Sequence, residues 1–529
     1  MTRTTRPLLA LVLLPALLAP PLAATCGGGG GGGMGGVRRG GGPGGSTSSG
    51  GLGARNAPGP LGDIYQVPWS VVHNGEEVPA PIAAPAGAPA DNLVVYWFPT
   101  SAQEAKASEL QASRELTLLT ARCVTLALVA SDNGELRARF AGGKGPYVVL
   151  AEAGGKELGR VAADTDPHLK ASQVEKLVSG ELKGREAALD RDLAAARDKE
   201  RHGDVDGAAA LYQKVWAARC LVPGKLPKKA AEALKKLGRP VPADTVGSLG
   251  APAIHAAHPA NAADIARIER TLGAGLAAED AGRYLEARGL YARAHRLDPA
   301  DPVPLRYLGE LYRHHLGDWA AARRTFEQVL AMPADPISRA VALHGLGKMT
   351  IHAGDFARGL SLIEQSVATY PLPLAYRNLA VYWNSEGQVE KAQGFAEQAL
   401  ALDPDDPYTQ IFVAAFIAED GRREEALRIA HANEDLLAAS YNLAAIHALL
   451  GHRDEALALL RRHFYDYERF DAVRDKEMKE AREDIVFTAL KQDPRFIALT
   501  AKAETASQAA AEAKLPVPVQ PMPGGKAMP

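Results

Sequence analysis

Hydrophobic and polar positions follow two different periods along this chain of 529 residues. In the N-terminal part, short runs of β-branched and aromatic residues predict strands over residues 92–98, 123–129, 147–151 and 156–161. Between the first two runs, residues 103–119 have the spacing of an amphipathic helix. The order of strand, helix, parallel strand and hairpin predicts a small α/β sandwich.

A helical pattern that repeats itself occupies the C-terminal half. Glycines recur at positions 282, 317, 354, 387, 421 and 451, with spacings of 35, 37, 33, 34 and 30 residues. Five residues after each glycine stands a small residue, namely Ala287, Ala322, Gly359, Ala392, Ala426 and Ala456. A small side chain at this place lets two antiparallel helices approach closely. The pattern therefore predicts a stack of helical hairpins.

These offsets resemble the tetratricopeptide repeat over residues 263–500, and an earlier copy is expected around Gly203 within a helical segment, residues 171–239. A Pro/Ala-rich linker over 240–262 separates the two, and residues 501–529 are expected to be a disordered tail. The resemblance implies an all-α superhelix that follows the α/β domain. Its first helices would line a concave groove that binds a protein or peptide, so a scaffold rather than an enzyme is predicted.

The groove positions that the resemblance implies carry basic, imidazole or amide side chains. They are Arg306, Arg313, His314, His344, Lys348, His352, Arg377 and Asn384. Such a set favours an acidic segment or a C-terminal carboxylate as the ligand, held by charge-assisted hydrogen bonds. Glu310 lies among them and the family's clamp pattern is not reproduced. A solvated helix face without a ligand therefore stays open as the alternative.

Residues 63–170 resemble a thioredoxin-like domain. The Tyr-Trp pair at 96–97 precedes the expected active loop, and Pro146 stands where that family has its cis-proline. The redox cysteines are missing, because Ser101 and Glu104 occupy their positions. Disulfide exchange requires a thiolate of depressed pKa, so this domain is predicted to be redox-inactive and to serve as a docking module.

The three cysteines of the chain are too few for a disulfide framework. Cys123 lies inside a predicted strand and is expected to be a small core residue. The alternative interpretation is an enzyme of thiol or peroxide metabolism in the cell envelope that acts through Cys123 or Cys220. No cofactor, metal site or nucleic-acid surface is expected, since the formal net charge is −2 and His255 and His258 have no third ligand nearby.

Residues 1–26 have the organisation of a bacterial signal peptide: a basic start, an apolar run and small residues before Cys26. This end resembles a lipoprotein lipobox, from which Thr25 departs. Lipidation of Cys26 and ordinary cleavage near Ala24 both stay open. Residues 27–62 hold 19 of the 52 glycines and predict a flexible tether. We expect an exported protein of the periplasm or cell envelope, with a lipid anchor in the membrane if Cys26 is modified.

Overall fold

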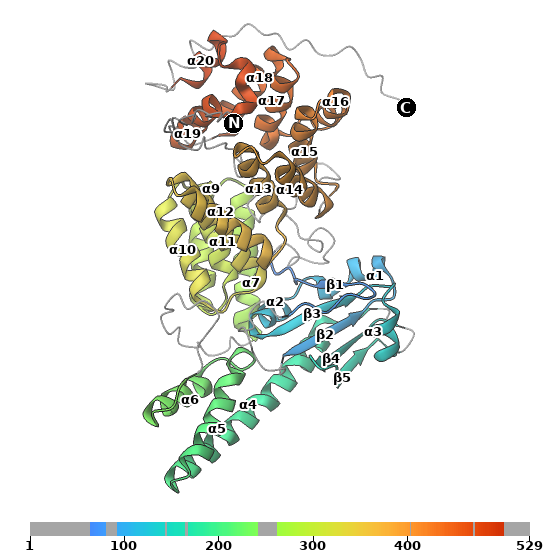
Figure 1. Ribbon diagram of the computed structural model, residues 1–529, viewed down its shortest axis with the longest axis vertical. Helices are drawn as coiled ribbons and strands as arrows, with labels where there is room; N and C mark the ends of the chain where they lie inside the picture. The colour runs from blue at the N-terminus through green and yellow to red at the C-terminus, as the bar shows by residue number, and fades with distance from the viewer. Residues whose placement is uncertain are drawn as a thin grey trace, which may run out of the picture.

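The computed structural model describes residues 64–80, 92–142, 145–163, 168–241, 262–402, 404–468 and 471–501. The predicted signal peptide with Cys26, the tether, nearly all of the linker and the C-terminal tail lie outside these ranges. Within them, no helix combines the length and the apolar character needed to cross a membrane. Figure 1 shows an elongated molecule with the N-terminal sheet toward one end and the last helices at the other.

A single five-stranded sheet forms the N-terminal part of the described chain. Its strands are β1 (Ser70–Val72), β2 (Leu93–Phe98), β3 (Val124–Val129), β4 (Tyr147–Glu152) and β5 (Glu157–Ala162). Their order is β1-β3-β2-β4-β5. Strand β3 pairs in parallel with β1 and β2, whereas β4 is antiparallel to β2 and β5. The four predicted strands are confirmed, and the three-residue β1 was not predicted.

The central strand β2 is buried on both faces. Its odd-numbered residues, from Leu93 to Trp97, join a hydrophobic core with three long helices. These are α4 (Ala171–Arg201), α5 (Val205–Ala217) and α6 (Lys225–Lys236). The even-numbered residues, from Val94 to Phe98, pack into a second core on the opposite face. Because side chains alternate along a strand, one apolar run supplies both cores.

The helix expected over residues 103–119 is interrupted. The structure has α1 (Ala102–Ala107), η2 (Glu109–Gln111), α2 (Arg114–Leu119) and η3 (Thr120–Arg122) instead, and α3 (Gly134–Arg139) follows β3. The hydroxyls of Ser108 and Ser113 accept hydrogen bonds from the backbone amides of Leu110 and Leu116. Serine hydroxyls thus start two new short elements and compete with continuation of the first helix.

Cys123 is buried in the core as expected, but it is not a free thiol. It forms a disulfide with Cys220, 97 residues further along, in the short helix η4 (Ala218–Cys220). The two Cα atoms are 5.5 Å apart. Helices α4 and α5 share the core beneath the sheet, and this packing brings η4 to the start of β3. Sequence spacing alone does not reveal such a pairing.

Six helical hairpins follow within residues 262–402 and 404–468. They are α7 (Ala262–Asp280) with α8 (Tyr284–Leu297), α9 (Val303–His314) with α10 (Trp319–Ala331), α11 (Pro336–His352) with α12 (Phe356–Thr369), α13 (Pro373–Ser385) with α14 (Val389–Leu402), α15 (Pro407–Glu419) with α16 (Arg423–Ala432), and α17 (Ser440–Leu449) with α18 (Arg453–Arg462). Each repeated glycine lies at a hairpin turn, with φ between 63° and 97°. Each small residue five positions later is buried. The repeat prediction is confirmed.

Phe326 shows how neighbouring hairpins fit together. A Cβ atom added at Gly309, in α9, or at Gly345, in α11, would come within 2.4 Å of the Phe326 ring. The aromatic side chain of α10 therefore fills the space left by glycines on two first helices. Close packing of this kind explains why large and small residues recur at fixed offsets.

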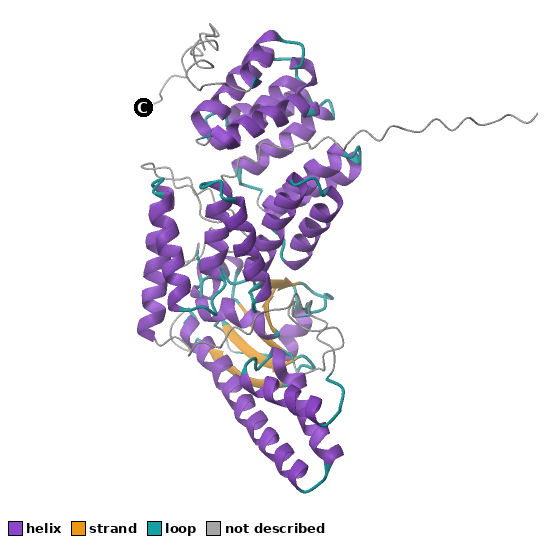
Figure 2. Cartoon of the chain, turned by 90° about the vertical axis from the view of Figure 1, so that its left-hand side faces the viewer, coloured by secondary structure: helices purple, strands orange, loops and turns teal. Residues whose placement is uncertain are grey.

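The described part of the chain ends with a less regular segment after α18. It contains the π-helix η6 (His463–Tyr467), α19 (Asp471–Glu483), η7 (Ile485–Leu490) and α20 (Pro494–Thr500), while the short η5 (Leu437–Ala439) lies between α16 and α17. Residues of η7 and α20 belong to the hydrophobic core of the last hairpins. Figure 2 shows the sheet between the repeat helices on one side and the projecting helices α4–α6 on the other.

Candidate functional site

The groove of the first hairpins is occupied by residues 64–66 of the same chain, which we call the docked segment. Ile64 and Tyr65 are buried in the core of these hairpins. Arg306 Nη2 donates a hydrogen bond of 2.9 Å to the carbonyl oxygen of Ile64. Gln66 Nε2 lies 3.4 Å from the Tyr370 hydroxyl. The docked segment thus contacts two successive hairpins.

Buried charged groups also join the α/β part to the first hairpins, and we call this contact the junction. The Tyr65 hydroxyl donates to Asp301 Oδ2 at 2.5 Å, and Arg114 Nε donates to the same oxygen at 3.2 Å. Arg114 also forms an ion pair with Asp298. The side chains of Arg114 and Asp301 are 4% and 0% exposed. The α/β part and the first repeats are therefore joined by an ion pair that water does not reach.

All eight predicted groove residues lie on α9, α11 and α13, the first helices of their hairpins. On α9, Glu310 is the centre of a buried group. Arg313 Nη2 donates to it at 3.0 Å, and His314 Nε2 lies 3.2 Å away. Burial opposes ionisation, but Arg313 and His314 hold the pKa of Glu310 well below its ordinary value. Burial and the adjacent Arg313 lower the pKa of His314 to about 4.

The remaining groove residues are paired as well. His344 is 2.6 Å from Asn378 Nδ2, and burial lowers its pKa well below the ordinary value. Arg377 donates to Thr409 at 2.5 Å, His352 lies 3.3 Å from Glu480, and Asn384 donates to Glu419 at 3.2 Å. Lys348 is 8% exposed and also has an interaction partner. Together with Arg306, these side chains form an internal polar network rather than a free basic surface.

A pocket opens further along the concave side, between α13, α15, α17 and η7. We call it the C-terminal pocket, and its cavity volume is about 40 Å³. Its lining residues are Val381, Asn384, Phe412, Ala415, Phe416, Glu419, Tyr441, Asn442, Ala445, Asp484, Ile485 and Val486. Aromatic and aliphatic groups make up most of the wall. A few polar groups complete it, which is the composition of sites that bind an apolar group in a fixed orientation.

The pocket contains a buried polar atom without a partner in the described part of the chain, as the earlier repeats do at Arg306 Nε and Arg377 Nε. Asn442 is 3% exposed, yet its Nδ2 has no hydrogen-bond partner among the described residues. Burial raises the pKa of Asp484 to about 6 and also raises that of Glu419. The Asp484 carboxylate accepts a hydrogen bond of 3.1 Å from Tyr441. The pocket therefore offers a buried amide donor beside two carboxyl groups whose pKa values burial raises.

Sequence reasoning identified only Asn384 among the pocket residues. A signal was present in α15, whose residues 411–418 are apolar on all sides of the helix. A first helix that packs on one side only would show a polar face. The apolar face of α15 toward the groove could thus have indicated a binding surface, whereas the contribution of η7 could not be read from the sequence.

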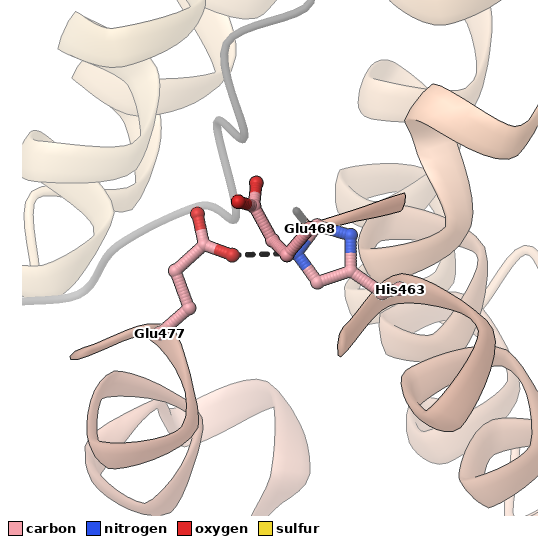
Figure 3. A group of neighbouring side chains, drawn as sticks. All are labelled: His463, Glu468 and Glu477. Atoms are coloured by element: carbon pink, nitrogen blue, oxygen red, sulfur yellow. Dashed lines mark hydrogen bonds and ion pairs between the residues drawn. The ribbon is translucent and has the colours of Figure 1, made fainter. Parts of the chain in front are cut away.

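One group of side chains within the described residues has the donors of a metal site. His463, Glu468 and Glu477 each offer one ligand atom, and these atoms lie within 4.8 Å of one another. His463 Nε2 is 2.8 Å from Glu477 Oε2, as Figure 3 shows. Burial and the neighbouring Glu477 raise the pKa of Glu468 to about 8. Sequence reasoning missed this group, although His463 and Glu468 are five residues apart, the span of one π-helical hydrogen bond.

The positions of the missing redox cysteines form a helix cap. Ser101 Oγ accepts a hydrogen bond of 3.1 Å from the Glu104 amide, and Glu104 Oε2 accepts one of 3.2 Å from the Thr100 amide. Reciprocal bonds of this kind start a helix and supply no thiolate. The peptide bond before Pro146 is not cis, since the described residues contain no cis peptide. The expected cis-proline is therefore not observed.

Comparison with known proteins supports the nature of the repeats. Residues 305–340 match the family model of the tetratricopeptide repeat. Over 130 residues the chain is 32% identical to the protein CTR9 homolog of Arabidopsis thaliana, a match that covers 24% of this chain and 12% of that protein. The chain thus spans only a small part of this curated relative. Together with the hairpin geometry, the family match shows that the chain contains tetratricopeptide repeats.

Solved structures resemble the repeat region only in part. The Pseudomonas aeruginosa protein pilF is 14% identical and aligns with a TM-score of 0.30, over 41% of this chain and 98% of its own. A thermophilic tetratricopeptide protein of Thermus thermophilus is 22% identical with a TM-score of 0.27, over 36% of this chain and 99% of its own. Both scores lie below 0.5, so neither similarity adds to the description of the site.

Proposed function

We propose that the protein is a scaffold whose C-terminal pocket binds a segment of a partner protein. The observation that carries this proposal is Asn442, a buried amide whose Nδ2 has no partner among the described residues and which lines an otherwise apolar pocket. A buried donor without an acceptor costs about 1–3 kcal/mol. A peptide carbonyl placed in the pocket removes this cost, while Phe412 and Phe416 cover an apolar side chain of the same peptide.

The charges of the pocket favour a neutral or basic segment. Glu419 and Asp484 line the pocket, and an acidic ligand would meet like charges there. The acidic or C-terminal carboxylate ligand expected from the sequence has no support from this geometry. Arg306, Lys348 and Arg377 are buried and already engaged within the chain. An acidic peptide would have to displace their present partners.

Photo-crosslinking tests this function. Benzoylphenylalanine at Ala415, a half-buried pocket residue, should give covalent adducts with a partner in cells. The control is the same label at Leu285, which lies on α8 and is 66% exposed. Adding Asn442→Ala to the Ala415-labelled chain should reduce the adduct yield several-fold. Equal adducts from both positions, or a yield that ignores the Asn442→Ala substitution, would refute a role for the pocket.

We also propose that the protein is exported to the periplasm or cell envelope, with Cys26 as a lipidation site in the membrane. The signal-like residues 1–26 and the disulfide between Cys123 and Cys220 both support this location, because disulfides persist in oxidising compartments. Mass analysis of the purified N-terminus tests the proposal. Cleavage before Cys26 with a mass increase of acyl chains would support the anchor. An intact Met1 on protein with reduced Cys123 and Cys220 would contradict export.

For the α/β part we propose a thioredoxin-like docking module without redox activity. The parallel β2 and β3, the antiparallel hairpin β4–β5 and the Ser101 cap support this interpretation. The alternative, a thiol enzyme using Cys123 or Cys220, requires a free thiol, and both sulfurs are bonded to each other. An insulin-reduction assay separates the two. Turnover by the natural chain that disappears in Cys220→Ser would favour the enzyme.

A further inference from the structure

We propose that His463, Glu468 and Glu477 bind a divalent transition-metal ion, with Zn²⁺ as the ion used to test it. The three ligand atoms lie within 4.8 Å of one another. Figure 3 shows the two carboxylates near each other, with the His463 ring on one side and a bond from Glu477 to that ring. His463 belongs to η6, Glu468 follows it directly, and Glu477 lies in α19. The site therefore joins the last repeat to the helix after it.

The donor set fits this class of ion. Zinc is bound in proteins by imidazole nitrogen and carboxylate oxygen, and three protein ligands leave a fourth position for water. Two carboxylates balance the charge of a divalent cation. Without a cation, two carboxyl groups share a site beside a fully buried ring, and both can carry a charge there only at a high cost.

The imidazole is held in place and its second nitrogen is free to take a proton. Its ring lies 5.3 Å from that of Tyr441 and 5.4 Å from that of Tyr467. Among the described residues, Nδ1 has no hydrogen-bond partner. When an ion replaces the proton on Nε2, that proton can move to Nδ1, so a neutral ligand forms without rearrangement of the ring. The π-helical turn, a geometry frequent at functional sites, sets the spacing of His463 and Glu468.

A second His–Glu pair, whose glutamate lies on the same helix α19, serves as an internal control. Glu480 lies three residues after Glu477 in α19 and is 3.3 Å from His352. No third metal-binding side chain joins this pair within the described part of the chain. The two pairs thus have the same donor chemistry and similar burial, and both glutamates lie on α19. They differ in the additional carboxylate of Glu468.

Calorimetric titration of the full, untagged chain with Zn²⁺ tests the proposal. We expect one saturable site per chain, and Glu468→Gln and Glu477→Gln should each weaken binding by at least about 10-fold. Glu480→Gln should bind Zn²⁺ as the natural chain does. Glutamine preserves size, so circular dichroism of the zinc-free variants should show an unchanged fold. His463 is fully buried and is left in place to avoid unfolding.

Two further measurements keep the result specific. The double variant His255→Ala/His258→Ala should retain the site, and X-ray absorption of the zinc-loaded chain should show imidazole and oxygen ligands without sulfur. The proposal is overturned if the natural chain shows no saturable binding, if both glutamine variants bind as tightly as the natural chain, or if the bound zinc has a sulfur ligand. It does not depend on what the C-terminal pocket binds.

Discussion

The first and the last hairpins of the repeat region share one helical framework, but their concave surfaces differ. The first is covered by other parts of the chain, and the last holds an open pocket. Around α9 and α11, the docked segment and Arg114 cover the groove, and buried Tyr65, Asp301 and Arg306 are bonded to one another or to backbone. Around α15 and α17, a pocket remains open and the buried amide of Asn442 has no partner among the described residues. The repeat itself does not decide whether its groove is available.

Segments outside the repeats make this difference. The docked segment and α2 cover the first hairpins, whereas η7 and the residue before it, Asp484, line the pocket at the last ones. A buried ion pair stabilises the covered groove at the first hairpins, and apolar walls around an open pocket at the last ones favour a ligand. The following substitutions test this contrast, beginning with the largest expected effect.

Substitution of Arg114, at the covered groove of the first hairpins, should cause the largest loss of stability. Arg114→Met leaves Asp298 and Asp301 without their buried counter-charge, and we expect a loss of about 3–5 kcal/mol in the free energy of unfolding. Urea denaturation measures the loss. Adding Asp301→Asn should recover part of it, because the uncompensated charge is then gone. A loss below about 1 kcal/mol for Arg114→Met would show that the junction is not closed in solution.

Removal of the disulfide should act on the α/β core alone. Cys123→Ala with Cys220→Ala frees a loop of 97 residues, and the expected loss is about 2–5 kcal/mol. Hydrogen exchange should quicken in β3 and α5, which share a core that excludes α15–α18. Equal acceleration in α15–α18 would mean that the two regions unfold as one unit.

The pocket carboxyl Asp484 should make stability depend on pH. Burial raises its pKa from 3.8 to about 6, so the folded chain binds this proton more strongly than the unfolded chain. The stability it supplies is complete below about pH 4 and is lost as the pH rises through about 6. At pH 8 the free energy of unfolding of Asp484→Asn should therefore exceed that of the natural chain by about 1–3 kcal/mol. At pH 4 the two free energies should be equal. A stability difference that is the same at both pH values would contradict this assignment.

Two buried asparagines provide the smallest and most closely matched test. Asn378 is 5% exposed and bonded to His344, whereas Asn442 is 3% exposed with an unpaired Nδ2. Asn378→Ala should cost about 1–3 kcal/mol because it leaves a buried imidazole without its partner. Asn442→Ala should cost less than about 1 kcal/mol. Thermal denaturation of both variants checks the order, and a larger cost at Asn442 would reverse our interpretation of the two concave surfaces.

Much of the fold follows from local pattern. The glycines at 282 to 451 predict the hairpin turns, and the apolar run of β2 predicts a strand buried on both faces. The site was harder to predict from the sequence, because Arg306 and Arg377 have their partners, Ile64 and Thr409, on other elements. The disulfide, the docked segment and the group around His463 likewise join residues far apart in the chain. Periodicity reports which face of a helix is apolar and does not report what covers a polar one.

Thiol labelling at two positions tests the divided groove most directly. Cysteine is introduced at Ile64, 1% exposed in the docked segment, or at half-buried Ala415 in the pocket, in a chain with Cys26→Ser. We predict that Ile64→Cys reacts with a maleimide at least about 100-fold more slowly than Ala415→Cys, since reaction requires local opening of the junction. Equal rates, or faster labelling at Ile64→Cys, would contradict the account.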